Sequence, residues 1–279
     1  LSAIALGCAP LIATQVYAQG VSVTTMLAIR FSIPALAFWA IVAARRAPLP
    51  DRTTIVRGLL QGALFYATQA LLFFTAIERV DASVATVLFY LYPALVFVVA
   101  VPLGRDRFSR LRFAAVPVSI VGVALVAAGA GIGSVDVLGA AMAAGSALAY
   151  VGFTLHGDAV AQRADPFVLV ALLATGAVGT FVGFGLATGE LHGPIPTAGW
   201  LWIVAVGCTT IVAYFAFFKA IRSAGPSLAS ILAMLEPVFV LGVAGLLLGE
   251  RLAPVQLVGA VLVVASVLAV NAVELKRAT

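Results

Sequence analysis

The chain repeats part of its own sequence, and the repeat falls within runs of apolar residues. The stretch that ends at Pro93 returns 144 residues later, where it ends at Pro237. When Ala76–Leu103 is laid without gaps on Ala220–Leu247, 11 of 28 positions are identical. A chain rich in Ala, Val and Leu matches itself by chance, so the shared serine and proline carry more weight than the aliphatic matches. The pattern indicates an internal duplication.

The composition places this repeat in a lipid bilayer. Hydrophobic residues make up 63% of the chain, charged residues make up 10%, and the mean hydropathy is +1.16, values that exclude a soluble domain with a hydrated surface. A helix needs about 20 apolar residues to cross about 30 Å of hydrocarbon. The sequence predicts ten such spans, near residues 2–18, 22–44, 55–77, 82–103, 113–131, 137–155, 166–187, 199–218, 227–248 and 255–272.

The ten spans divide into two sets of five. The division lies at a glycine-rich stretch near residues 129–136, so we expect one half over residues 1–133 and a second over 134–279. Because five is odd, the second half enters the membrane with the opposite orientation, which is the design of many secondary transporters. The predicted fold class is an all-α integral membrane protein with ten transmembrane helices in two inverted five-helix repeats.

Basic residues indicate the orientation of the chain. Of the 16 Lys and Arg residues, 13 fall in alternate loops on one side, only Arg79 and Arg251 fall on the other side, and Arg30 lies within a span. Basic loops stay in the cytoplasm, so both termini are expected there. The net charge of +5 therefore reflects membrane orientation, and we expect no nucleic-acid partner. A cleaved signal peptide is the alternative for residues 1–18, but no basic stretch precedes this apolar run.

Motifs in both halves resemble a known family. The second half contains Pro-Ser-Leu-Ala-Ser-Ile from Pro226, Leu-Glu-Pro-Val-Phe from Leu235, and Leu-Val-Gly-Ala-Val-Leu from Leu257. These motifs resemble the C-terminal part of an EamA repeat, in the drug/metabolite transporter superfamily. Asp81-Ala-Ser-Val-Ala in the first half and the arginine-bearing Met26-Leu-Ala-Ile-Arg-Phe are similar to the same repeat.

The resemblance covers essentially the whole chain. It implies ten helices in two inverted repeats, a central cavity, and efflux of small metabolites across the bacterial inner membrane. The first half departs from the pattern, because it has Tyr92 where the second half has Glu236. This departure argues against two equivalent binding sites.

Two ionisable residues lie well inside spans, and each is a candidate functional residue because charge at that depth must face protein or water. Glu236 lies about ten residues into its helix, near mid-membrane at 1.5 Å per residue. It can couple proton entry to solute exit or pair with a cationic solute; the alternative is a structural glutamate that pairs with Arg30. Arg30 can hold a solute carboxylate, or it can serve as an anchor that hydrogen-bonds the helix backbone.

Pro93 and Pro237 occupy equivalent helices at equivalent depths. Each removes a backbone donor and frees a carbonyl four residues upstream, so we expect a helix break or hinge at both positions. Symmetry-related broken helices point to the central site of a transporter. Ordinary helix kinks without ligand contact are the alternative.

Aromatic and amide side chains interrupt the aliphatic spans. Such groups need partners in lipid, so several must face a cavity or another helix. An aromatic pocket with one carboxylate suits an amphipathic or cationic solute. The candidate substrate residues of this kind are Tyr66, Gln69, Tyr90, Tyr92, Tyr150 and Tyr214.

We therefore expect a secondary active transporter that exports amino acids or related amphipathic solutes across the inner membrane by alternating access, coupled to protons. A multidrug exporter of lipophilic cations, a passive channel and a lipid-modifying membrane enzyme are the alternatives. The acidic residues are scattered, the chain lacks a Gly-x-x-x-x-Gly-Lys-Ser/Thr sequence, and His156 and His192 lie far apart, so we expect neither an enzyme nor a metal or other cofactor. The expected partners are the lipid bilayer, a small-molecule substrate and protons, and the protein is expected to be a monomer or a homodimer.

Overall fold

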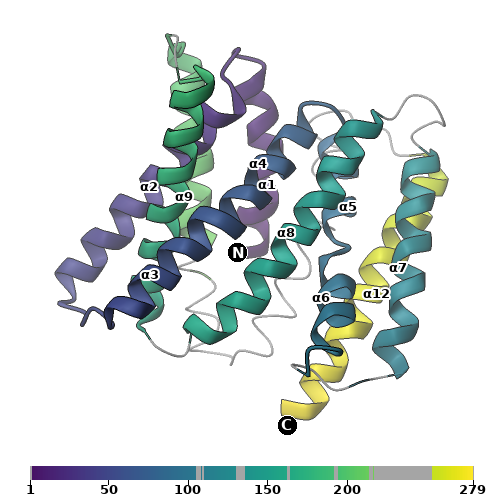
Figure 1. Ribbon diagram of the computed structural model, residues 1–279. Helices are drawn as coiled ribbons and strands as arrows, with labels where there is room; N and C mark the ends of the chain where they lie inside the picture. Colours follow the sequence, from purple (N-terminus) through teal and green to yellow (C-terminus); the bar gives the residue numbers. More distant parts are fainter. Residues whose placement is uncertain are drawn as a thin grey trace.

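The structure is a computed structural model that describes residues 2–104, 108, 110–129, 136–161, 164–191, 194–213, 216 and 253–278. Within these ranges the chain forms helices joined by short connections, and no residue there belongs to a strand. The helices lie alongside one another in a bundle (Figure 1). The predicted span at 227–248 lies outside the described residues.

The first half contains two helical spans that are interrupted. Its elements are α1 (Ser2–Tyr17), α2 (Val23–Ala44), α3 (Arg52–Leu60), the π-helix η1 (Gln61–Tyr66), α4 (Ala67–Ile77), α5 (Ala82–Phe89), α6 (Tyr92–Ala100) and α7 (Arg110–Gly129). The segments α3, η1 and α4 follow one another directly and cross as one span, and α5 and α6 together form the next.

The described part of the second half contains four helices. They are α8 (Val137–Ala161), α9 (Pro166–Thr188), the helix Thr197–Ala213 and α12 (Pro254–Ala278). Five helical stretches of the described residues are long and apolar enough to cross a membrane, and Phe113–Val126, Thr197–Ala213 and Pro254–Ser266 are shorter apolar helices. All eight fall at predicted spans.

Polar residues at the helix starts explain where several helices begin. Ser22 accepts a hydrogen bond from the amide of Thr25 at the start of α2, and Asp165 accepts one from Phe167 at the start of α9. These side chains satisfy amide groups that have no partner within the helix. Gly189 ends α9 in a left-handed conformation with φ 74°, which a glycine adopts at little steric cost.

The helix α9 of the second half packs against α2 and the α3–η1 segment of the first half (Figure 1). A side chain at Gly62 would overlap the backbone of Leu173, and one at Gly176 would overlap the carbonyl of Leu59. The two glycines therefore permit direct contact between the backbones of η1 and α9.

Polar and stacking contacts also connect α2 with α9 along their length. At one end, the hydroxyls of Ser22 and Thr25 donate to the carbonyl of Glu190, at 3.1 and 2.7 Å. Farther along, the Trp39 indole donates to Thr175 Oγ1 at 2.9 Å. At the other end, the Arg45 guanidinium lies 4.5 Å from the ring centroid of Phe167. These contacts therefore extend over the whole of α2, from Ser22, which precedes the helix, to Arg45, which follows it.

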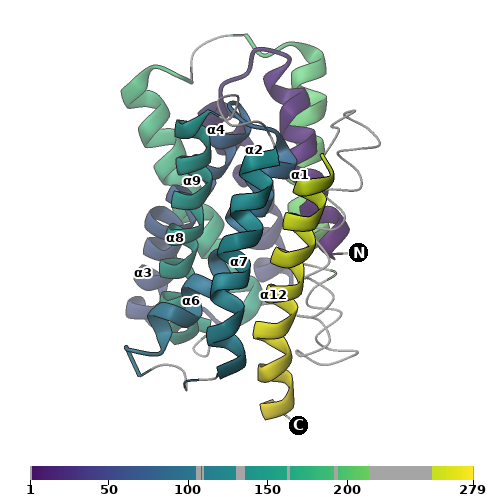
Figure 2. The ribbon, with the colours of Figure 1, turned by 90° about the vertical axis from the view of Figure 1, so that its right-hand side faces the viewer.

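The helices α7 and α12 pack together at the other edge of the bundle (Figures 1 and 2). A side chain at Gly122 would come within 2.7 Å of the Gly259 carbonyl oxygen, and one at Gly259 would overlap the carbonyl of Gly122. Gly122 lies in Val-Gly-Val-Ala-Leu of the first half, and Gly259 lies in the similar Val-Gly-Ala-Val-Leu of the second half. The closest approach of α7 and α12 therefore involves similar sequence from both halves.

Candidate functional site

Aromatic side chains from both halves meet in the interior, and we call this group the aromatic circuit. Neighbouring ring centroids around it lie 5.1–5.3 Å apart, a spacing typical of favourable aromatic pairs. In order of contact, its members are Phe31 of α2, Tyr66 of η1, Phe153 and Tyr150 of α8, Phe89 of α5, and Phe73 and Phe74 of α4.

Arg30 closes the circuit. Its guanidinium carbon lies 5.3 Å from the ring centroid of Phe31 and 4.6 Å from that of Phe74, and the residue is only 4% exposed. A cation over aromatic faces is stabilised by about 2 kcal/mol when it is withdrawn from water. The hydroxyl of Tyr17 donates to the Phe74 carbonyl at 3.1 Å and ties α1 to the same place. The site therefore combines a buried positive charge with aromatic surface.

Tyr90, Tyr92 and Pro93 lie where the fourth span is interrupted. The helix α5 ends at Phe89, two residues follow as a turn up to Leu91, and α6 begins at Tyr92 with Pro93 in its first turn. Pro93 has no N–H to donate to the Phe89 carbonyl, so the interruption lies where the sequence predicts it. Its role as a hinge stays a prediction.

The interruption brings Tyr92 into contact with the circuit. Its ring centroid lies 4.6 Å from that of Tyr150 and 5.2 Å from that of Phe89. Tyr90 is buried and lies 5.9 Å from Phe89 and 5.8 Å from Tyr92. The interruption thus allows two tyrosines separated by one residue to approach the same phenylalanine.

The π-helix η1 places Tyr66 in the circuit. The amide of Ala67 donates to the Gly62 carbonyl, five residues back, whereas in an α-helix it would donate to Ala63. Gln61 at the start of η1 is buried, and its side-chain amide donates to the Phe153 carbonyl on α8 at 3.3 Å. Gln69, three residues after Tyr66, is buried on α4 and 7% exposed. Local π-helical turns occur frequently at functional sites.

The structure thus brings together Arg30, Tyr66, Tyr90, Tyr92 and Tyr150 of the predicted site residues. Glu236, Pro237 and Tyr214 lie outside the described residues.

Sequence reasoning missed Phe31, Phe73 and Phe74 as site residues. A signal was present, because Phe73 and Phe74 follow Tyr66 by about two helical turns and so lie near the same face. Phe31 directly follows Arg30, and this neighbouring position gave no helical spacing by which to recognise it.

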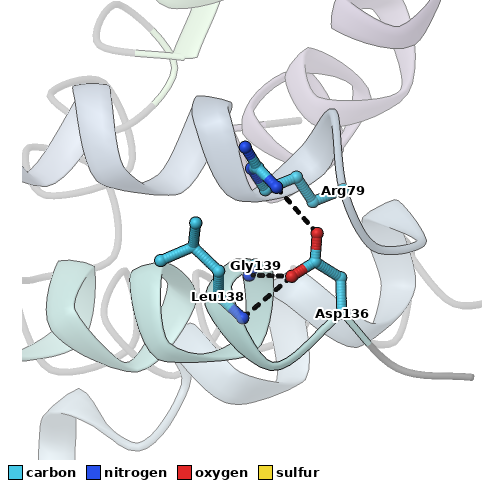
Figure 3. A network of polar contacts seen from close by, with 4 residues as sticks. All are labelled: Arg79, Asp136, Leu138 and Gly139. Atoms are coloured by element: carbon cyan, nitrogen blue, oxygen red, sulfur yellow. Dashed lines mark hydrogen bonds and ion pairs between the residues drawn. The ribbon is translucent and has the colours of Figure 1, made fainter. Parts of the chain in front are cut away.

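An ion pair lies at the junction between the halves (Figure 3). Arg79 follows α4, and its Nη1 atom lies 2.8 Å from Oδ2 of Asp136, the residue that precedes α8. Oδ1 of Asp136 accepts hydrogen bonds from the amides of Leu138 and Gly139, at 2.8 and 3.2 Å. The hydrogen bond from Arg79 and those from the two amides hold the pKa of Asp136 below its usual value.

A pair of acidic residues lies near Arg79. Partial burial raises the pKa of Glu78, the carboxylate of Glu190 raises it further, and Arg79 opposes the rise. Glu190 is the residue whose carbonyl accepts from the start of α2. The carboxylate of Glu190, which follows α9, therefore acts on Glu78 at the end of α4.

No group of three or more His, Cys, Asp or Glu side chains that could hold a metal occurs within the described part of the chain. His156 lies beside Phe65 of η1, with ring centroids 5.6 Å apart.

Apolar helices of membrane-crossing length and an interior site of aromatic rings and arginine define a multi-pass membrane protein with a polar group in its interior. The model of the EamA-like transporter family matches residues 1–128 and again 137–272. The chain belongs to this family, and it is a membrane transporter.

The known proteins that are similar to this chain include a relative and a solved structure. An uncharacterized transporter of Bacillus subtilis (strain 168), YcbK, is 26% identical over 257 residues, which cover 87% of this chain and 81% of the relative. A solved structure titled "Crystal structure of protein" has a TM-score of 0.68 at 16% identity, and the matched region covers 98% of this chain and 95% of the chain in that structure. At that identity the second likeness shows the fold alone.

Proposed function

We propose that the protein is a secondary active transporter that exports a small amphipathic solute by alternating access, through ten transmembrane helices in two inverted five-helix repeats. Two separate matches to the same family model support the repeat. The proposed location is the bacterial inner membrane with both termini in the cytoplasm, which the distribution of Lys and Arg supports.

The observation that carries the proposal is the depth of the aromatic circuit. Tyr66 lies about 16 Å from the end of its span at Ile77, and Tyr150 lies about 20 Å from the start of α8, at 1.5 Å per residue. These distances are about one half and about two thirds of the hydrocarbon thickness of about 30 Å, so both residues lie in the middle part of the membrane. A solute bound at this depth can be reached in turn from either side, as alternating access requires.

The chemistry of the site favours a solute that has both a carboxylate and an apolar part, as amino acids do. The Arg30 guanidinium can bind a carboxylate through two parallel hydrogen bonds, and the rings supply apolar surface. A buried positive charge disfavours a solute that is only cationic.

The test begins with purified protein and a panel of amino acids and lipophilic cations. A solute that binds the folded state raises its apparent melting temperature. The solutes that stabilise the protein are then loaded into proteoliposomes and their efflux is measured. Stabilisation by zwitterions is expected; stabilisation by tetraphenylphosphonium alone would identify a cation exporter instead.

Substitutions of Arg30 test the assignment of the carboxylate. Arg30→Lys should weaken solute binding because lysine keeps the charge but loses the planar two-point contact, and Arg30→Met should weaken it further, by about tenfold to hundredfold relative to the native protein. Equal binding by the two variants and the native protein would contradict the assignment.

Glu236 is the proposed proton-coupling residue, because its predicted depth equals that of the circuit. Glu236→Gln should remove efflux driven by a pH gradient while it leaves solute binding within a few fold. Efflux with an unchanged pH dependence would exclude coupling through this carboxyl group.

A further inference from the structure

The π-helix η1 leaves one backbone carbonyl in need of a donor. Because the amide of Ala67 donates to Gly62, the Ala63 carbonyl loses the partner that an α-helix would provide. The hydroxyl of Thr180 on α9 donates to this carbonyl at 2.8 Å. A side chain of the second half thus supplies the hydrogen bond that η1 withdraws within the first half.

The contact between the two backbones makes this bond possible. Gly62 lies against Leu173, and Gly176 lies one turn before Thr180 against Leu59. Thr180 also lies 3.4 Å from the Gly176 carbonyl of its own helix, a longer and weaker alternative for the same hydroxyl proton. The shorter bond crosses between the helices.

The π-turn determines the direction of Tyr66. A π-turn contains one residue more than an α-turn. If it became α-helical, the helix on one side of the turn would rotate about its own axis, relative to the other side, by the angle of one residue, about 100°. Tyr66 is the last residue of η1 and contacts Phe31 and Phe153 on either side. Loss of the turn would therefore move Tyr66 out of the aromatic circuit.

We propose that Thr180 is a positioning residue for the solute site: its hydroxyl stabilises the π-helical turn at Ala63 and thereby holds the ring of Tyr66 in the aromatic circuit. The inference rests on the proposed function only in that the circuit binds the solute. Thr180 itself touches no ring of the circuit among the contacts described above, and it acts through the backbone of η1.

The test compares Thr180→Val, which removes the hydroxyl and keeps the shape, with Thr180→Ser, which keeps the hydroxyl. Thr188→Val is the matched control, because Thr188 lies on the same helix and, among the described residues, donates only to the Phe184 carbonyl of that helix, at 3.0 Å. The protein is labelled with 3-fluorotyrosine in detergent micelles, and Tyr66→Phe identifies the resonance of Tyr66 among those of the six tyrosines.

We expect the fluorine resonance of Tyr66 to shift in Thr180→Val and to stay in place in Thr180→Ser and Thr188→Val. Hydrogen exchange over residues 61–67 should become about fivefold to tenfold faster in Thr180→Val, the factor that follows from the loss of one ordinary hydrogen bond. If Thr180→Val does not fold, Thr180→Ala is judged by the same criteria.

An unmoved resonance with unchanged exchange in the variant that lacks the hydroxyl would overturn the inference. A shift in Thr180→Ser equal to that in Thr180→Val would do the same, because it would show that shape and not the hydroxyl is responsible. Neither measurement needs a solute. Failure of the efflux assay with an intact Tyr66 signature would therefore count against the proposed function alone.

Discussion

Two of the places where the halves meet are built differently. At both, glycines permit close backbone contact, Gly62 and Gly176 between η1 and α9, and Gly122 and Gly259 between α7 and α12. The contact of α9 also includes the hydrogen bond from Trp39 of α2 to Thr175, and it lies beside the aromatic circuit, since Phe181 of α9 packs against Phe31. For α7 and α12, the described residues show no hydrogen bond between side chains of the two helices.

Close packing alone therefore does not fix the positions of particular side chains. The α7–α12 contact carries aliphatic side chains around its glycines, such as Val126 and Val263, both nearly fully buried. Such a contact stabilises the bundle by packing, without a directional bond between the side chains of α7 and α12 among the described residues. The α9 contact adds a π-turn and directional bonds, which fix the place of particular side chains.

The largest effect is expected from Tyr150→Ala. Tyr150 contacts Phe89, Tyr92 and Phe153, so its removal takes away several faces of the site at once. Solute binding should weaken about tenfold to hundredfold, as for removal of a buried aromatic group. The matched control is Phe113→Ala on α7, because Phe113 is 60% exposed. In this variant, solute binding should change less than about twofold. Isothermal titration of both variants with a solute from the panel checks this, and equal losses would remove the distinction between the regions.

Alanine at the glycine contacts should sharpen the distinction. Gly62→Ala and Gly259→Ala each place a methyl group against a backbone carbonyl, and each should lower the free energy of unfolding by about 1–3 kcal/mol. Only Gly62→Ala should also shift the fluorine resonance of Tyr66. Gly179→Ala is the control, since a side chain there meets nothing within 4 Å. Thermal melts and fluorine spectra measure the two effects; a Tyr66 shift in Gly259→Ala would show that the regions are not independent.

The smallest effect concerns the ion pair of Figure 3. Because the pKa of Asp136 is lowered, its stabilising contribution is present above the ordinary aspartate pKa of about 3.9 and is lost as the pH falls through the lowered value. Asp136→Asn keeps an oxygen that can accept from the amides of α8 and loses the charge. Its melting temperature should lie slightly below that of the native protein at pH 7, and the difference should shrink as the pH falls below the ordinary aspartate pKa. A difference that does not shrink as the pH is lowered would contradict the linkage.

The helices themselves could be predicted because span length depends on the run of apolar residues alone. The predicted spans 22–44 and 166–187 differ by one residue from α2 and α9. The interruption before Pro93 followed from the missing N–H of proline. For these features the cause lies within a few neighbouring residues.

The site could be predicted only in part. The tyrosines and Arg30 were recognisable as polar groups in lipid, whereas η1 was not, because its extra residue leaves no mark in the sequence of the span. Thr180 was missed because a hydroxyl that donates within its own helix looks the same in sequence as one that donates across to Ala63. Likewise Arg79 could be assigned to a loop, but its partner Asp136 lies 57 residues away.

The ties between α2 and α9 have a mechanical consequence. Contacts join the two helices at three positions along their length. Thr25 donates a hydrogen bond to the Glu190 carbonyl, Trp39 donates one to Thr175, and the Arg45 guanidinium lies over the Phe167 ring. α2 lies in the first segment that the family model matches, and α9 lies in the second. Any large movement that preserves these contacts must therefore move the two helices together as one rigid unit. A pair of spin labels, one on each helix, would then keep a constant separation during such a movement, and the two segments that the family model matches would not move as separate bodies.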